Sequence, residues 1–271
     1  MEPKTILLTG ATDGIGLETA RMLAADGHTL LLHGRNPAKL EAVEKVLAAL
    51  PGAGQIHWYV ADLSRLANVE TMARAVSEAH DRLDVLINNA GVFTSPETLT
   101  PDGLDIRFAV NTIAPYSLTR RLLPLMNATG RVVNLSSAAQ ASLAPKALHG
   151  PSRLGDGAVY AQSKLALTMW SRHMALSLGD DGPSVIAVNP RSYLGSKMVK
   201  EAYGREGADL GIGADILCRA ALSEEFADAS GTYFDNDVGR FASPHPDALD
   251  AQKCREVVRE IEAILSGISH R

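Results

Sequence analysis

The chain has 271 residues, 46% hydrophobic and 21% charged, with a formal net charge of -5 dispersed along it; this balance is that of one globular unit and argues against a nucleic-acid-binding surface. No apolar run approaches the roughly 18 residues of a membrane span, and the first residues lack a signal-peptide pattern, so we expect a cytoplasmic protein without a membrane partner. Cys218 and Cys254 lie far apart without a ligand pattern, which predicts no disulfide and no metal site.

Short apolar runs alternate with helical patterns along the first 190 residues. The runs predict strands at Thr5–Thr9, Thr29–His33, Ile56–Val60, Val85–Asn88, Arg131–Leu135, Ser184–Asn189 and, as the last, Thr232–Phe234. Helices are predicted at Gly14–Ala25, after the N-caps Asn36 and Ser64, and at Val159–Leu178. Strands that alternate with helices pair in parallel through right-handed crossovers. We therefore predict an α/β chain with a Rossmann-type doubly wound parallel sheet, a single domain over residues 1–271.

Two segments interrupt the alternation of strands and helices. Residues 140–157 and 191–215 are both rich in Gly, Pro, Ser and Ala. A doubly wound sheet binds its ligand beyond the carboxyl ends of its strands, where both segments are expected to lie. We predict that they form loops and short helices that line a substrate pocket.

A glycine-rich turn joins the first predicted strand to the first predicted helix. Gly10 allows a tight turn, Gly14 lets a pyrophosphate approach the backbone, and Gly16 lets the helix pack close to the sheet. Free amides at the helix start donate to an anion. Turns use glycine in any case, but the order of strand, turn and helix favours dinucleotide binding. The turn residues expected at the cofactor are Gly10, Thr12, Asp13, Gly14, Ile15 and Gly16.

The end of the second predicted strand distinguishes NADP from NAD. A carboxylate at this position would accept hydrogen bonds from a free ribose 2′-hydroxyl, but residues 33–36 read His-Gly-Arg-Asn. Arg35, with Asn36 beside it, is placed to bind a 2′-phosphate as a bidentate donor. The alternative is a solvated surface arginine. We expect NADP (NADPH) as the cofactor, with NAD disfavoured.

Tyr160 and Lys164 lie four residues apart on a predicted helix, which places them on one face. A tyrosine titrates ordinarily near pH 10, and a neighbouring ammonium group favours the phenolate and lowers that pKa. Such a pair can exchange a proton with a carbonyl or alcohol oxygen while a cofactor carries the hydride. The spacing alone is common on helix surfaces, so its meaning depends on the glycine-rich turn.

These motifs together resemble the short-chain dehydrogenase/reductase family, over residues 5 to about 200. The matching motifs, in the family's order, are TGATDGIG at 9–16, Asp62-Leu63, NNAG at 88–91, Asn111, Ser136-Ser137, and Tyr160 with Lys164. Within the family, VNTIAPYSLTRRLLP at 110–124 and GTYFDND at 231–237 are most similar to retinol-dehydrogenase-like and related bacterial members.

The resemblance implies a role for each catalytic position. Tyr160 would be the general acid–base, and Lys164 would hold the nicotinamide ribose and lower the tyrosine pKa. Ser137, rather than the adjacent Ser136, would hydrogen-bond the substrate oxygen. Asn111 would hold a water in a proton relay to Lys164, although an asparagine at this position could also only bend or cap a helix.

The resemblance also implies further cofactor contacts. Asp62 would bond the adenine amine with Leu63 beside it, and Asn89, Ala90 and Gly91 would pass close to the cofactor. Asn88 is expected to support this loop through local hydrogen bonds.

The chain departs from the family's pattern in two places. The family usually has Pro-Gly where this sequence has Pro190-Arg191. Pro190 stays among the expected cofactor contacts, whereas Arg191 either changes the local backbone path, anchors the substrate or faces solvent. Ser196 is the candidate for the residue that bonds the carboxamide. The interval from Ser137 to Tyr160 is about ten residues longer than in many members, and its His149 is expected to be a surface residue.

The motifs and the resemblance predict an enzyme that reduces an aldehyde or ketone to an alcohol, or runs the reverse reaction, on a small-molecule substrate. The alternative is a non-catalytic NADP-binding regulatory protein on the same scaffold. It is disfavoured because both Tyr160 and Lys164 are present. Sugar epimerases and dehydratases use the same pair but carry a different glycine spacing. The resemblance further implies a homodimer or homotetramer.

Overall fold

The parallel sheet is the frame on which the candidate site is built. The computed structural model describes residues 2–204 and 206–269, so Arg205 of the predicted segment 191–215 and the outermost residues of the predicted domain lie outside it. In the described part, an 8-stranded sheet has the order β3-β2-β1-β4-β5-β6-β7-β8. The strands are β1 (Thr5–Leu8), β2 (Thr29–Gly34), β3 (Ile56–Val60), β4 (Val85–Asn88), β5 (Arg131–Leu135), β6 (Ser184–Asn189), β7 (Tyr233–Asp235) and β8 (Arg240–Ala242).

Neighbouring strands pair in parallel from β3 to β7, and only the β7–β8 pair is antiparallel. This arrangement confirms the predicted Rossmann-type doubly wound sheet. The sequence pattern did not predict β8, which adds an antiparallel edge strand. The chain runs from β1 outward to β3 and then returns to β4 on the other side of β1. The carboxyl ends of β1 and β4 therefore flank the switch point, where doubly wound sheets bind ligands.

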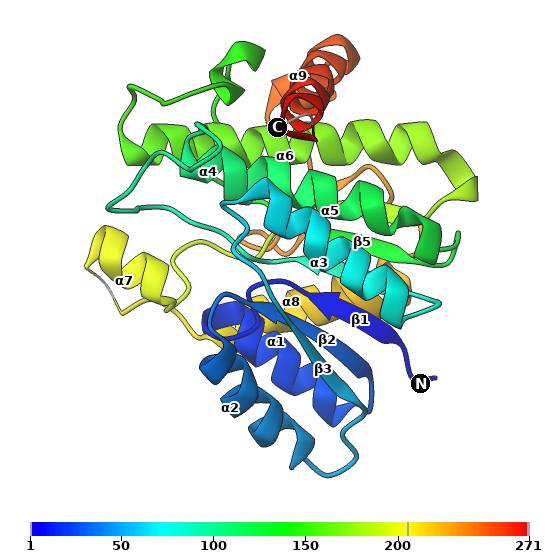
Figure 1. Ribbon diagram of the computed structural model, residues 1–271. Helices are drawn as coiled ribbons and strands as arrows, with labels where there is room; N and C mark the ends of the chain where they lie inside the picture. Colours follow the sequence, from blue (N-terminus) through cyan, green and yellow to red (C-terminus); the bar gives the residue numbers. More distant parts are fainter. Residues whose placement is uncertain (1, 205, 270–271) are drawn as a thin grey trace.

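Helices cover both faces of the sheet (Figure 1). The helices are α1 (Gly14–Ala25), α2 (Pro37–Ala48), α3 (Leu66–Ala79), α4 (Ile106–Phe108), α5 (Ala114–Leu122), α6 (Asp156–Leu178), α7 (Lys197–Tyr203), α8 (Leu210–Leu222) and α9 (Ala251–Ser269). In Figure 1, α3, α5 and α6 lie on one face and α1, α2 and α8 on the other. Two clusters of buried apolar side chains correspond to these two faces.

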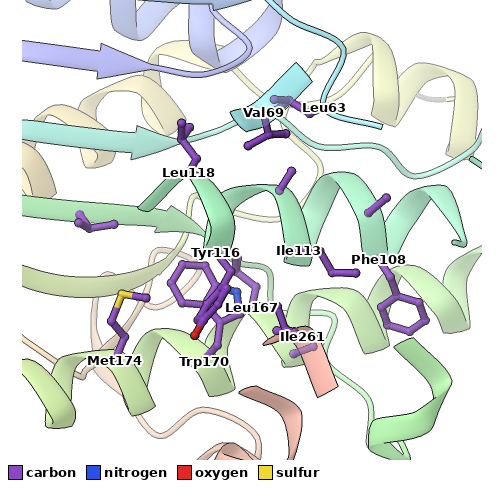
Figure 2. Packing of buried hydrophobic residues seen from close by; sticks show 14 of the residues in the cluster. Leu63, Val69, Phe108, Ile113, Tyr116, Leu118, Leu167, Trp170, Met174 and Ile261 are labelled. Carbon is purple, nitrogen blue, oxygen red and sulfur yellow. The ribbon is translucent and has the colours of Figure 1, made fainter. Parts of the chain in front are cut away.

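The core on the α5–α6 face is built from large, fully buried side chains. Phe108 and Trp170 are both 0% exposed, and the Tyr116 ring meets the Trp170 indole edge to face, with ring centroids 5.5 Å apart (Figure 2). Truncation of such an aromatic side chain to alanine typically costs about 3–5 kcal/mol. This packing fixes α6, the helix that contains Tyr160 and Lys164, against the sheet.

The final helix, α9, packs on the outer side of α6 (Figure 1). Val257, Ile261 and Ile264 bury its apolar stripe in the same cluster as Trp170. The Glu262 carboxylate accepts hydrogen bonds from the Tyr116 hydroxyl and the Arg120 guanidinium, both at 2.8 Å. A second layer of helix thus covers the side of α6 that faces away from the sheet.

Two predicted helix starts were wrong. Ser64 does not cap α3: its amide and hydroxyl both donate to Asp62 Oδ1, at 3.0 and 2.8 Å. The amide of Leu66, the first residue of α3, instead donates to Asp102 Oδ2 at 2.9 Å. The long helix begins at Asp156, not at Val159.

Candidate active site

The glycine-rich turn folds tightly against the loop that follows β4. Gly10 has φ +69°, and a Cβ on it would lie 3.0 Å from Ala90 Cα. A Cβ on Gly16 would lie 2.2 Å from the Gly10 carbonyl oxygen, so neither position accepts a side chain. Asp13 Oδ1 accepts a hydrogen bond of 2.7 Å from the Gly14 amide. The Asp13 carboxylate therefore caps α1, a local role that the sequence analysis had not assigned to it.

The loop after β4 is bonded directly to this turn. The Asn89 side-chain amide donates to the carbonyl oxygens of Thr9 and Gly10, at 2.8 and 3.2 Å. The amides of Asn89 and Ala90 both donate to Thr9 Oγ1 at 3.0 Å. Asn88 does not support this loop through local hydrogen bonds, because its side chain donates to Thr119 Oγ1 of α5 and to Asn134 Oδ1 of β5 inside the protein. The two loops at the switch point thus form one bonded unit.

Residues that follow β2 and β3 are partly engaged with neighbouring groups. Asn36 Oδ1 caps α2 through the Lys39 amide at 3.1 Å, and Asp62 Oδ1 is occupied by Ser64. Leu63 is buried, whereas Arg35 is exposed at the end of β2. Arg35 therefore presents a positive charge at the strand end where the sequence lacks a carboxylate.

Lys164 and Tyr160 extend from the first turns of α6. Lys164 Nζ donates to the Leu135 carbonyl oxygen at 2.6 Å and lies 5.6 Å from the centroid of the Tyr160 ring. It also lies 3.7 Å from the point where a Cβ on Gly91 would sit. Burial lowers the pKa of Lys164 to about 8. The Tyr160 ring packs at 4.8 Å from the Phe93 ring, which follows the same β4 loop.

Asn111 connects that loop to α6. It lies in a π-helical turn (Ala109–Ile113), and such wide turns are frequent at functional sites. Its Oδ1 accepts from the Val92 amide at 2.8 Å, and its Nδ2 donates to the Val92 carbonyl oxygen at 2.9 Å and to Ser163 Oγ at 3.0 Å. The Ser163 hydroxyl in turn donates to the Tyr160 carbonyl oxygen at 2.7 Å.

The two serines after β5 point in different directions. Ser136 is 3% exposed, and its hydroxyl lies 2.7 Å from Thr168 Oγ1 of α6. Ser137 is half-buried and its Oγ accepts from the Ala139 amide at 3.1 Å. Its carbonyl oxygen accepts from the Tyr233 hydroxyl at 3.1 Å and from the Gln140 side chain at 3.0 Å. Ser136 thus holds β5 to α6, and only Ser137 has an accessible hydroxyl.

Arg191 has a backbone conformation that favours glycine, and its side chain is exposed. Arg191 has φ +116° and Tyr193 has φ +56°, both in the region that favours glycine. The Asp237 carboxylate, in the turn after β7, accepts from the Ser192 amide at 2.9 Å and from the Ser192 hydroxyl at 2.6 Å. The Asp237 carboxylate therefore holds the loop after β6 in place.

Ser196 lies at the start of α7, next to the glycine-rich turn. Its Oγ caps the helix through the Val199 amide at 3.3 Å, and its Cβ lies 3.6 Å from the point where a Cβ on Gly14 would sit. Met198 comes within 3.8 Å of the corresponding point on Gly91. The start of α7 thus lies close to both the glycine-rich turn and the loop after β4.

The other predicted pocket segment, 140–157, is anchored by charges. Arg107 is 2% exposed and makes a bidentate pair with Asp105, with Nη2 2.7 Å from Oδ2 and Nε 2.8 Å from Oδ1. Its other terminal nitrogen bonds Asp156, the first residue of α6. His149 is exposed, as expected, and pairs with Glu260 of α9 at 2.9 Å.

Several residues that support the site were missed by the sequence analysis. Asp237, Tyr233 and Asp156 act through pairs of residues far apart in the chain, which a sequence does not reveal. His33 had a readable signal, because it is a polar residue inside an otherwise apolar strand.

The described residues contain no group of three or more His, Cys, Asp or Glu side chains able to hold a metal ion. Cys218 and Cys254 are free thiols, and none of the described helices is long and apolar enough to cross a membrane.

Residues 4–207 match the family model described as short chain dehydrogenase. Human retinol dehydrogenase 13 is 32% identical over 276 residues, which cover 95% of this chain and 83% of the relative. The chloroplastic short-chain dehydrogenase TIC 32 A of Brassica napus is 32% identical over 85% of this chain and 79% of its own length.

Solved structures share the fold over most of the chain. An uncharacterised protein of Mycobacterium paratuberculosis superposes with a TM-score of 0.75 and 26% identity, covering 96% of this chain and 92% of that one. The landomycin C-6 ketoreductase LanV, solved with NADP and rabelomycin, gives a TM-score of 0.68 at 28% identity over 87% and 95% of the two chains. The family model, the relatives and the fold agree that this chain belongs to the short-chain dehydrogenase family and is an oxidoreductase of that family.

Proposed function

We propose that this protein is an NADP-dependent oxidoreductase that interconverts a carbonyl compound and an alcohol, with Tyr160 as its acid–base group. The observation that carries the proposal is that Lys164 Nζ lies beside the Tyr160 ring and faces Gly91 across the crevice. A titratable hydroxyl, a buried amine and a glycine-lined approach meet at the sheet edge where this fold binds ligands.

The crevice fits a dinucleotide on the observations described above. Gly10 and Gly16 leave no room for a Cβ, and Gly14 has φ +57° at the first turn of the 12-residue helix α1, whose first amides favour an anion. Gly91 is exposed and opens toward Lys164 and Asn111. When bound, NADP would supply or accept the hydride.

The protein's own residues would handle the proton and the orientation. In reduction, the Tyr160 hydroxyl donates its proton to the carbonyl oxygen, and the Ser137 hydroxyl hydrogen-bonds the same oxygen as charge develops there. Lys164 would hold the ribose hydroxyls of the bound cofactor. Asn111 fixes Val92 and, through Ser163, the Tyr160 turn of α6. This places Asn111 between the loop that borders the crevice and the helix that carries the acid.

The preference for NADP is supported by Arg35 and by the absence of a carboxylate at residues 33–36. LanV, solved with NADP, is a relative of the same fold. Steady-state kinetics with NADPH and NADH test it: we expect a higher kcat/KM for NADPH, reduced to that for NADH by Arg35→Ala. Equal or better efficiency with NADH in the wild-type protein would contradict the assignment.

The chemical role of Tyr160 is tested by Tyr160→Phe, which removes one oxygen atom. We expect turnover to fall at least a thousandfold while the Kd for NADPH changes little, because the hydroxyl is needed for the proton and not for the cofactor. The substrates to screen are aldehydes, ketones and quinones with NADPH. A Tyr160→Phe protein with normal turnover would defeat the mechanism, and binding of NADPH without turnover of any carbonyl would favour the regulatory alternative. The cytoplasmic location and a homodimer or homotetramer stay predictions from the sequence.

A further inference from the structure

His33 is a buried histidine that takes no part in the proposed chemistry, yet it contacts two strand ends that border the crevice. It lies on β2 and is 2% exposed. Its Nδ1 lies 3.2 Å from the amide nitrogen of Gly10, and its Nε2 lies 3.0 Å from the carbonyl oxygen of Ala61.

These two partners define the tautomer of the imidazole. The Gly10 amide can only donate, so Nδ1 accepts and carries no hydrogen. The Ala61 carbonyl can only accept, so Nε2 carries the hydrogen. The Gly10 bond requires the neutral ring, because a protonated Nδ1 could not accept, whereas the Ala61 bond is compatible with either protonation state. Burial lowers the pKa of His33 to about 4 although the Ala61 hydrogen bond raises it, and the nearby charges of Arg35 and Asp62 have opposite, smaller effects. The neutral form therefore persists at physiological pH.

Through these bonds, His33 connects two parts of the proposed dinucleotide site. Gly10 is the first glycine of the turn after β1, and Ala61 follows β3 and precedes Asp62, the residue expected at the adenine. The backbone reinforces the connection, since the Ala11 amide donates to the His33 carbonyl oxygen at 2.9 Å and the Ala61 amide to the Gly34 carbonyl oxygen at 3.2 Å. One imidazole thus spans from the phosphate side to the adenine side of the crevice.

We propose that His33 is a positioning residue of the dinucleotide site: its imidazole holds the Gly10 amide and the Ala61–Asp62 backbone at a fixed separation, and so sets the affinity for the cofactor. The proposal rests on the proposed function, because it assumes that the crevice binds NADP. Loss of one buried hydrogen-bond partner is expected to weaken binding about tenfold. His33 touches no reacting atom, so kcat at saturating NADPH is expected to stay within about twofold.

Three variants separate the two bonds. In His33→Asn the side-chain oxygen can occupy the place of Nδ1 and accept from Gly10. In His33→Gln the side-chain amide can reach the place of Nε2 and donate to Ala61. His33→Leu keeps an apolar side chain in the strand and loses both bonds. We expect the Kd for NADPH, from fluorescence titration, to rise at least tenfold in His33→Leu and clearly less in His33→Asn than in His33→Gln.

A second measurement needs no cofactor. In the cofactor-free protein, hydrogen–deuterium exchange of the peptide covering residues 9–16 should be faster in His33→Leu and His33→Gln than in the wild type and in His33→Asn. Long-range ¹H–¹⁵N spectra of the wild-type protein should report His33 protonated on Nε2 alone, which keeps the proposal testable even if a variant fails to fold.

The outcomes distinguish this proposal from the proposed function. A wild-type protein that binds neither NADPH nor NADH overturns the proposed function, and the positioning role with it. Binding by the wild type together with an unchanged Kd in His33→Leu overturns only the positioning role. Equal Kd values for the Asn and Gln variants, or a wild-type His33 protonated on Nδ1, overturn it as well.

Discussion

Replacing Lys164 with methionine should stabilise the fold while it destroys the activity. Lys164 is buried, and this burial lowers its pKa to about 8, against an ordinary value near 10.4. At about 1.4 kcal/mol for each factor of ten, keeping this amine charged at pH 7 costs the folded state about 3 kcal/mol. Methionine has a similar length without the charge. Its substitution also leaves the Leu135 carbonyl without the 2.6 Å hydrogen bond, at a cost of about 1 kcal/mol.

The expected net gain is about 2 kcal/mol at pH 7, or an increase in Tm of about 4 °C. The sign depends on pH in a way that identifies the cause. Between pH 8 and pH 10.4 the unfolded state binds the proton that the folded state has released, so the stability of the wild-type protein rises with pH there. The advantage of Lys164→Met should therefore shrink to about zero near pH 9.5.

Urea unfolding at pH 7 and pH 9.5, followed by circular dichroism, measures both values. Leu165→Met, at the next buried position of α6, is the matched control and should cost less than about 1.5 kcal/mol at either pH. NADPH-dependent turnover of a carbonyl substrate should be lost in Lys164→Met and retained in the control. A Lys164→Met protein that is less stable than the wild type at pH 7, or equally stabilised at both pH values, would refute the reasoning.

Three further predictions concern the backbone strain at Arg191 and the buried side chains of Arg107 and His33. Arg191→Gly should stabilise the protein by about 1 kcal/mol. At φ +116° a residue with a Cβ is strained by about 1–3 kcal/mol, and the greater flexibility of glycine in the unfolded chain offsets part of the gain. Thermal unfolding checks this, and a lower Tm would show that the arginine side chain contributes more than its backbone conformation costs. Arg107→Met should lower the free energy of unfolding by about 3–5 kcal/mol, since it leaves the Asp105 carboxylate buried without its ion-pair partner. Urea unfolding of this variant and of Arg107→Lys measures the loss, and a loss below about 1 kcal/mol in Arg107→Met would contradict the prediction. The folded-state pKa of about 4 at His33 lies below its ordinary value near 6.5, so the unfolded state binds the proton first as the pH falls. The free energy of unfolding should therefore fall by about 2–3 kcal/mol between pH 7 and pH 4.5. If the free energy of unfolding of His33→Asn falls equally over this range, another group is titrating.

Much of the sheet could be predicted because parallel strands are buried on both sides and therefore read as uninterrupted apolar runs. Ile6, Leu7 and Leu8 are all 0% exposed, as are Leu30, Leu31 and Leu32 in β2. The edge strand β8 escaped prediction because its three residues are exposed or half-buried and form no apolar run, unlike those of the equally short β7. The start of α3 was wrong for a different reason: its capping partner, Asp102, is 36 residues away in the sequence, and no local pattern contains that information.

In the candidate site, too, some features could be predicted from the local sequence and others could not. The order of motifs singled out Tyr160, Lys164 and Asn111. The position of Tyr160 and Lys164 on one face of α6 follows from their four-residue spacing and is a matter of local geometry. The direction of a side chain is not. Asn111 was expected to hold a water or bend a helix, and in the structure it bonds Val92 and Ser163 within a π-helical turn. The Asp237 brace on Ser192 and the bridge through His33 depend on which strand ends become neighbours, and only the assembled sheet determines this.

The position of α9 has a consequence for how the protein is made. The helix that bears Tyr160 and Lys164 ends at Leu178, and the helix that covers its outer side begins at Ala251. A ribosome must add more than seventy residues between them, at roughly 5–20 residues per second. For those several seconds the apolar side of α6 has no permanent neighbour from its own chain. The last helix thus determines when the nascent protein stops exposing a surface that chaperones and other unfinished chains can bind.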